Sequence, residues 1–172
     1  MRFDSFNNYN RTVINGIEKE RLKEFDDNQG LLRNVFKQYK DKNEKLRLWG
    51  IKSDKLTRWN KIKPGDIIFF YRNKCIVSWC RVLDKFEEEN VATTLWGSFV
   101  GKHYPRYTWP LIIVLNEPNH CNIPFSVFSK ILGYADNYFL RSFFKLNERL
   151  NSAIEANYKN IEEFVSKESI KN

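Results

Sequence analysis

Four short apolar runs between residues 46 and 116 restrict the fold of this chain more than any other feature. They are, in sequence order, LRLWGI (46–51), DIIFFY (66–71), CIVSWCRVL (75–83) and PLIIVLN (110–116). β-Branched and aromatic residues dominate these runs, and turn-forming tripeptides such as Lys-Pro-Gly and Arg-Asn-Lys separate them. Strands so short and so closely spaced favour antiparallel pairing. The sequence therefore predicts a small, mostly antiparallel sheet or barrel.

Residues 61–80 predict one hairpin of that sheet. Pro64 fixes its own backbone angle, and Gly65 permits a turn that is closed to other residues. The chain can therefore reverse sharply into the second apolar run. Arg72-Asn73-Lys74 would form the tip of the hairpin, and the third run would return along the second.

Helical periodicity flanks the predicted sheet on both sides. Residues 16–44 predict two helices broken near residues 26–30, and residues 137–166 predict one long helix. The second helix has an apolar stripe that should face the core, formed by Leu31, Leu32, Val35, Phe36 and Tyr39. We therefore expect an α+β fold with one domain over residues 1–136. The C-terminal helix, within residues 137–172, would brace the sheet or connect it to a further domain.

Length and charge limit the class of protein further. A chain of 172 residues, 42% of them hydrophobic, supplies one complete core. Its 29 Lys and Arg residues exceed its 21 Asp and Glu residues by eight, which makes a polyanionic partner a serious hypothesis. No segment has the apolar core of a signal peptide or the length of a membrane span. We therefore expect a soluble, cytoplasmic protein without a membrane partner.

The sequence contains little that predicts catalysis. It lacks the phosphate-loop, dinucleotide, zinc-protease and serine-hydrolase motifs, and His103 and His120 have no partner at a catalytic spacing. Cys75, Cys80 and Cys121 lack CxxC spacing, which argues against a disulfide framework or a zinc site. The acidic run at residues 87–89 is interpreted as a solvated loop between strands. We expect neither an enzyme nor a bound metal or other cofactor.

All five tryptophans lie in the strand-rich middle of the chain, between residues 49 and 109. Trp is large and apolar, so most of them are expected in the core. Trp49, Trp59 and Trp96 differ, because each stands at a break in the apolar pattern, beside glycine or polar residues. Indoles at the mouth of a sheet are one means by which proteins stack a planar base.

Positive charge gathers around the same part of the chain. Residues 33–63 contain eleven Lys and Arg residues and three Asp and Glu residues, an excess of eight that equals the net charge of the chain. A solvated helix face accounts for Lys40, Lys42 and Lys45. The loop after Trp49 and two later loops are instead candidates for phosphate contact, through Lys52, Lys55, Arg58, Lys61, Lys63, Arg72, Lys74, Lys102 and Arg106.

The order of these motifs resembles that of the PUA-like superfamily. The ordered set is Trp49-Gly50, Trp59, Lys63-Pro64-Gly65-Asp66, Phe70-Tyr71, Leu95-Trp96-Gly97 and Trp109-Pro110. Within the superfamily it is most similar to EVE and YTH-type domains. Among those, it resembles the N-terminal DNA-recognition domain of archaeal McrB-type modification-dependent restriction GTPases. The resemblance covers roughly residues 46–116.

The resemblance implies a PUA-like β-barrel that flips a methylated base out of its strand and holds it in an aromatic cage. Carried over to this sequence, the base site consists of Trp49, Gly50, Ile51, Ser53, Asp54, Trp59, Tyr71 and Trp96. The implied partner is DNA with a modified base, with RNA as the alternative. A GTPase domain in the same full-length chain and a nuclease subunit are implied as well, and they would carry any catalytic activity.

Two hypotheses from other classes stay open on the sequence. A small amidohydrolase of the related ASCH group would need a Lys, Glu or Thr cluster in the pocket, for which Lys52 and Thr57 are the nearest candidates. An oligomerisation or adaptor module would use the predicted helix at residues 137–166. The modification that is read also stays open, because YTH-type readers carry a longer polar pattern after their first cage Trp than residues 50–53 offer.

Overall fold

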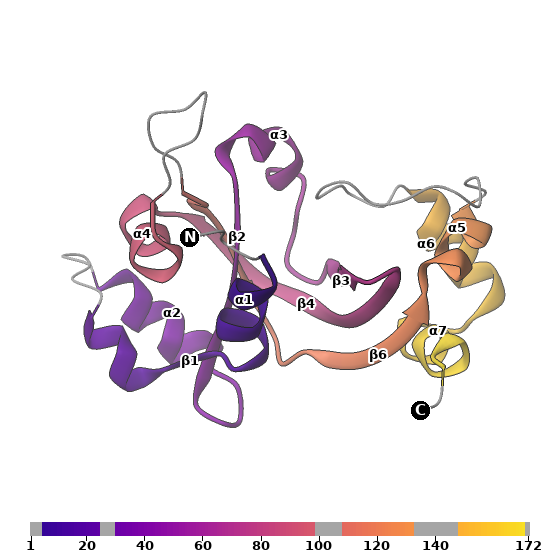
Figure 1. The fold of residues 1–172 in the computed structure, drawn as a ribbon, viewed down its shortest axis with the longest axis horizontal. Coiled ribbons are helices and arrows are strands. Elements are labelled where there is room, and N and C mark those ends of the chain that lie inside the picture. Colours follow the sequence, from indigo (N-terminus) through magenta and orange to yellow (C-terminus); the bar gives the residue numbers. More distant parts are fainter. Residues whose placement is uncertain (1–4, 25–29, 99–107, 133–147, 171–172) are drawn as a thin grey trace. The chain divides into compact units, whose positions relative to one another are not determined.

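The computed structural model describes residues 5–24, 30–98, 108–132 and 148–170, which belong to two compact units (Figure 1). The first unit contains residues 1–67 and 80–118, and the second contains residues 68–79 and 119–172. The long strand β4, Cys75–Glu87, passes from one to the other, with residues 75–79 in the second unit and residues 80–87 in the first.

The sheet of the first unit is antiparallel. It contains β1 (Ile17–Glu18), β2 (Lys45–Ile51), β5 (Leu111–Leu115) and the last part of β4, in the order β1-β2-β5-β4. The predicted strands over residues 46–51 and 110–116 are therefore confirmed. β1 was not predicted, because a strand of two residues is too short to produce an alternating pattern.

Two helices and one face of this sheet enclose the main core. α2 (Leu31–Tyr39) contributes Leu32, Val35 and Phe36 to this core. α4 (Glu89–Trp96) contributes Val91, Ala92, Leu95 and Trp96. They pack with the alternate residues Leu46 and Leu48 of β2 and Ile112 and Val114 of β5, all of them buried. Alternation along a strand sends every second side chain to the same face, which explains why alternate residues of β2 and β5 share this core. The apolar stripe of α2 packs in the same core, so that prediction is confirmed.

The remaining helical segments of this unit differ from the sequence-based expectation. α1 (Ser5–Tyr9) continues into a π-helical turn over Asn10–Ile14, and β1 is followed by a 3-10 helix over Lys19–Glu24. The prediction of an α-helix directly after residue 16 is wrong, because Ile17 is buried in a pairing with Leu46.

The acidic run at residues 87–89 is not the solvated loop that was expected. It ends β4 and begins α4, and the side chain of Glu88 accepts a hydrogen bond of 3.0 Å from the backbone N–H of Asn90. A carboxylate at this position satisfies one of the free N–H groups of the helix start. Gly97 ends the helix with a positive φ of 78°.

The second unit contains the predicted hairpin. β3 (Ile67–Arg72), which enters this unit at residue 68, is joined to the start of β4 through Asn73 and Lys74, both with positive φ (48° and 63°). Two consecutive left-handed residues are the signature of a tight hairpin turn. The predicted tip at residues 72–74 is confirmed.

Helices and a further strand complete the second unit. β6 (Asn119–Pro124) pairs with the start of β4 and leads directly into α5 (Phe125–Leu132). Figure 1 shows α5 beside α6 (Glu148–Asn157) and α7 (Ile161–Glu168). Phe128 connects these elements, because its ring meets Phe69 of β3 at 5.1 Å and Phe164 of α7 at 5.3 Å between centroids.

The predicted single helix at residues 137–166 is wrong over its described part. α6 ends at Asn157, and α7 begins after Asn160, whose side chain accepts a hydrogen bond of 2.9 Å from the N–H of Glu163. The apolar positions keep their helical spacing across the break, so periodicity alone does not reveal it. Residues 137–147 of the prediction lie outside the described residues.

The fold class is α+β with an antiparallel sheet, as predicted, but the predicted barrel is not confirmed. The described residues form six strands in this sheet. The strand order is β1-β2-β5-β4-β3, with β6 paired to β4. Among the described strands, no pairing joins β1 to β3, so the sheet is not closed.

Candidate nucleic-acid interface

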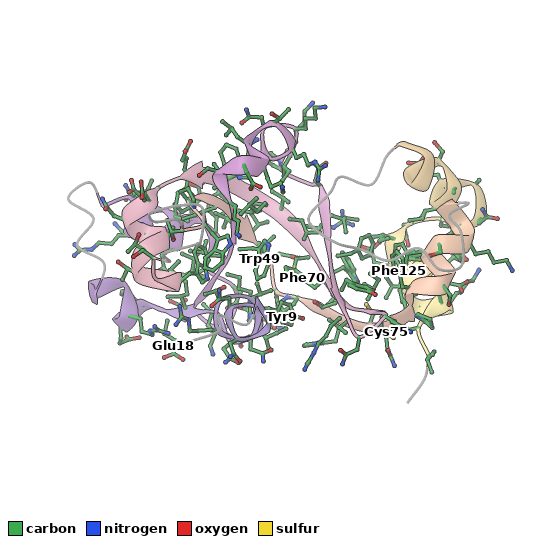
Figure 2. All side chains as sticks on the ribbon, turned by 45° about the horizontal axis from the view of Figure 1, so that its top comes forward. Tyr9, Glu18, Trp49, Phe70, Cys75 and Phe125 are labelled. Atoms are coloured by element: carbon green, nitrogen blue, oxygen red, sulfur yellow. The ribbon has the colours of Figure 1, made fainter. Side chains whose placement is uncertain are left out.

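Strand register decides which of the predicted site residues share a face. Trp49 of β2 pairs with Ile113 of β5, and Ile113 pairs with Lys85 of β4. Directly opposed residues of antiparallel strands project to the same face, so these three side chains form one row, called the Trp49 row below. Two strand spacings of about 4.8 Å each place the Cα atoms of Trp49 and Lys85 about 10 Å apart. Trp49 is half-buried and is labelled in Figure 2.

Trp96 belongs to the opposite face of the sheet. A Cβ atom on Gly50 would lie 2.5 Å from Cζ3 of Trp96 and 2.7 Å from Cβ of Trp109, so only glycine fits there. Gly50 follows Trp49 in β2 and therefore faces the other way. Trp96 is 2% exposed and meets Trp109 edge to face, with 6.5 Å between ring centroids. The structure thus places Trp96 in the core, away from the Trp49 row.

Trp59 lies at the end of α3 (Leu56–Trp59), on the same side as the Trp49 row. The ammonium of Lys85 stands 4.5 Å from the centroid of its ring. Trp59 is 8% exposed, and its indole Nε1–H has no hydrogen-bond acceptor among the described residues. Leaving such a donor buried and unpaired costs about 1–3 kcal/mol. Trp59 therefore offers a buried donor rather than an open stacking face.

The predicted base site also includes four residues at the end of β2 and directly after it. Ser53 and Asp54 are exposed in a 3-10 helix over Ser53–Lys55, and Asp54 forms an ion pair of 2.8 Å with Lys55. Gly50 is half-buried, and Ile51 is buried at the end of β2. Their main-chain groups belong to a strand that is paired with β5, where Gly50 is opposite Ile112 and Ile51 is opposite Leu111.

The segment over residues 52–63, called the basic segment below, carries most of the predicted phosphate contacts. Its exposed cations are Lys52, Arg58, Lys61 and Lys63, whereas Lys55 is half-buried. Lys61 and Lys63 form no ion pair with any residue that the structure describes. Five cations and one carboxylate in twelve residues give this segment a positive charge.

A turn fixes the end of the basic segment. The carboxylate of Asp66 accepts a hydrogen bond of 2.9 Å from the N–H of Lys63, and Gly65 adopts a φ of 91°. The N–H of Gly65 donates to the carbonyl of Val82, whose own N–H donates to the carbonyl of Asp66, both at 2.8 Å. The predicted Pro-Gly turn is confirmed, and it ties the segment to β4.

The other predicted site residues lie in the second unit or outside the described residues. Tyr71, Arg72 and Lys74 belong to the second unit, where the ring of Tyr71 meets Phe125 edge to face at 5.2 Å. Phe125 is labelled in Figure 2 at the start of α5. Lys102 and Arg106 lie outside the described residues.

Lys85 is a site residue that sequence patterns do not indicate. Its ammonium donates hydrogen bonds to the carbonyls of Trp59 (2.9 Å) and Asn60 (3.0 Å). A β-bulge shifts the register of β4 between Val82 and Asp84. Because a bulge changes which residues share a face, alternation along β4 does not assign Lys85 to a side.

The described titratable groups give no sign of nucleophilic or metal chemistry. Burial raises the pKa of the Cys80 thiol to about 12 and that of Cys121 to about 11. Protonated thiols are poor nucleophiles and poor metal ligands. Within the described residues, no three His, Cys, Asp or Glu side chains gather as a metal site.

The described helices also bear on whether the chain could span a membrane. None of them combines the length and the apolar character that a bilayer crossing needs.

No family model and no curated protein matches this sequence. Function therefore has to be inferred from the Trp49 row, Trp59 and the basic segment.

Proposed function

We propose that this chain is a nucleic-acid recognition domain that takes a methylated base out of its strand and holds it beside Trp49 and Trp59. The observation that carries the proposal is the position of Lys85, which shares the Trp49 row through the strand register and contacts the ring of Trp59, so that both indoles lie on one side of the sheet. The basic segment begins directly after β2, which carries Trp49, and contains Trp59. Aromatic rings beside a positive backbone-binding segment are the combination that flipped-base readers need.

The two indoles have different parts in this proposal. Trp49 is half-buried and would stack on the base, which contributes about 1–3 kcal/mol. Trp59 is buried together with its unpaired indole N–H, which would donate to an acceptor on the edge of the base once the ring turns outward. Flipping a base costs a few kcal/mol, so stacking, edge contacts and phosphate contacts have to offset that cost together.

The proposed function also implies a fold family, a partner and a biological system. We infer a PUA-like fold of the EVE and YTH type in which the open antiparallel sheet corresponds to the barrel. DNA with a modified base is the favoured partner, and RNA is the alternative. We place the protein in the cytoplasm, as the DNA-targeting part of a modification-dependent restriction system whose GTPase and nuclease activities reside elsewhere.

Binding to matched short oligonucleotides tests the proposal directly. Fluorescence anisotropy would compare unmodified, adenine-methylated and cytosine-methylated duplexes, and RNA of the same sequence, at two salt concentrations. A preference of about tenfold, or about 1.4 kcal/mol, for one methylated DNA is the expected result. Equal and steeply salt-dependent binding to all of them would reduce the domain to a backbone binder. No binding at all would favour the amidohydrolase or adaptor hypothesis.

Trp49→Ala is the variant that tests the base site. We expect its affinity for the preferred oligonucleotide to fall by about 1–3 kcal/mol, or about 5- to 150-fold. Tyr39→Ala is the matched control, because Tyr39 is also a half-buried aromatic residue but packs with the core on the opposite face of the sheet. A folded Trp49→Ala variant that binds like the control would contradict the assignment of Trp49.

A further inference from the structure

The basic segment contains a helix that is too short to be stable on its own. α3 has four residues, and no side chain caps its start. Helix formation has a costly nucleus, so a single turn in isolation does not persist in water. The carbonyls at its C-terminal end also lack partners within the helix. Contacts from outside therefore have to hold α3 in place.

Lys85 of β4 supplies those contacts. Its ammonium donates to the carbonyls of Trp59 and Asn60, the last residue of α3 and the one after it, at 2.9 and 3.0 Å. The same ammonium stands over the Trp59 ring at 4.5 Å. A cation at a helix C-terminus that also faces an indole is favoured by the helix dipole and by cation–π attraction. One side chain thus fixes both the backbone and the side chain at the end of α3.

The basic segment is then held at three places. Its start continues from the paired strand β2, its middle is bound by Lys85, and its end is tied to β4 through Gly65 and Asp66. Between the last two attachments, the N–H groups of Asn60, Lys61 and Ile62 form short-range hydrogen bonds of 2.8 to 3.2 Å to residues 56–59. The cations that flank α3 therefore project from a backbone fixed in advance.

We propose that Lys85 is a positioning residue that orders the basic segment for nucleic-acid binding and contacts no phosphate itself. The inference rests on the proposed function. Its physical reason is preorganisation: a segment that is already ordered loses less conformational entropy when it binds. Lys85 raises affinity through the arrangement of Arg58, Lys61 and Lys63, and not through its own charge.

The first test needs no nucleic acid. Lys85→Met keeps the length of the apolar stem and removes all donors. We expect hydrogen exchange over residues 56–62 to become about tenfold faster, together with faster tryptic cleavage after Arg58 and Lys61. Lys85→Arg retains donors and charge and should restore most of the protection. Lys45→Met is the control, because Lys45 is another half-buried sheet lysine, paired with Glu18 instead. Unchanged exchange in Lys85→Met would overturn the inference.

The second test separates positioning from direct phosphate contact. Lys85→Met should bind the preferred oligonucleotide about three- to tenfold more weakly, with an unchanged dependence of log K on log salt. A slope reduced by about 0.9 would overturn the inference, since it reports the loss of one phosphate contact. If exchange is faster in Lys85→Met but the wild-type protein binds no oligonucleotide, the contact of Lys85 with the end of α3 is confirmed. The proposed function, and with it this role of Lys85 in binding, would then be overturned.

Discussion

At the scale of single residues, the most demanding environment in the described structure is that of Arg47. The side chain of Arg47 is 5% exposed and donates to Asp41 Oδ2 from Nε at 2.9 Å and from Nη2 at 2.7 Å. It also donates to the carbonyls of Val13 and Ile14. Asp41 Oδ1 accepts from the N–H groups of Asn43 and Lys45. The pair thus joins the turn before β2 to the π-helical turn.

These contacts fix the protonation of Asp41. Burial acts to raise its pKa, but the hydrogen bonds from Lys45, Arg47 and Asn43 and the charge of Arg47 outweigh burial and hold the pKa below its usual value. A carboxyl whose pKa is lower in the folded state stabilises the fold above its unfolded pKa of about 3.9. That contribution is lost as the pH falls through the folded pKa.

Asp41→Asn is therefore expected to destabilise the protein strongly at neutral pH, because Arg47 keeps a buried charge without its partner. Breaking one side of a buried pair costs about 3–5 kcal/mol. Urea unfolding at pH 7 measures this loss, and repeating it at about pH 3 should give a smaller difference from wild type. Glu44→Gln removes an exposed partner of Lys40 and should cost at most about 1 kcal/mol. A loss in Asp41→Asn no larger than in this control would contradict the prediction.

At the scale of elements, the sequence reveals what local chemistry determines. The apolar stripe of α2 and the Pro64-Gly65 turn are short-range patterns, and both are present as predicted. Elements whose form depends on partners distant in sequence were missed. Ile17 becomes part of a strand only through Leu46, and the break at Asn160 is invisible to a periodicity that continues across it.

The β3–β4 turn contains a residue that is poorly suited to its backbone. Asn73 tolerates a left-handed conformation, whereas Lys74 adopts it, with a φ of 63°, at an energetic cost. Lys74→Gly should therefore raise stability by about 0.5–1 kcal/mol, which thermal unfolding would register as a rise of about 1–4 °C. Asn73→Gly is the control, and its gain should be smaller. A Lys74→Gly variant that unfolds at or below the wild-type temperature would refute this account of the turn.

At the scale of the whole molecule, the site could be predicted only in part. The sequence indicates Trp49 and the basic segment, because both are continuous in the chain. It does not indicate that Trp96 faces the opposite side of the sheet or that Lys85 covers Trp59. The first fact depends on the tertiary contact of Trp96 with Gly50, and the second on the register of β4, which a β-bulge shifts. Register is decided by tertiary pairing, which residue patterns within one strand do not specify.

The lysines of the basic part of the chain differ in whether they pair with a carboxylate. Residues 33–63 hold an excess of eight positive charges, equal to that of the whole chain. Lys40 and Lys42, however, pair with Glu44 and Glu117. Lys61 and Lys63 form no ion pair with a described residue. Two pairs of lysines in one short stretch thus differ in whether a carboxylate already neutralises them.

This difference makes a quantitative prediction about binding. The slope of log K against log salt is negative, and each phosphate contact contributes about 0.9 to its magnitude. Replacing Lys61 and Lys63 together by Gln should therefore reduce that magnitude by about 1.8 for duplex DNA. Replacing Lys40 and Lys42 by Gln changes the net charge equally but should leave the slope nearly unchanged. Salt titrations of both double variants by fluorescence anisotropy measure the difference. Equal losses of slope would mean that the protein attracts nucleic acid through diffuse charge, and that the basic segment has no defined contact with the backbone.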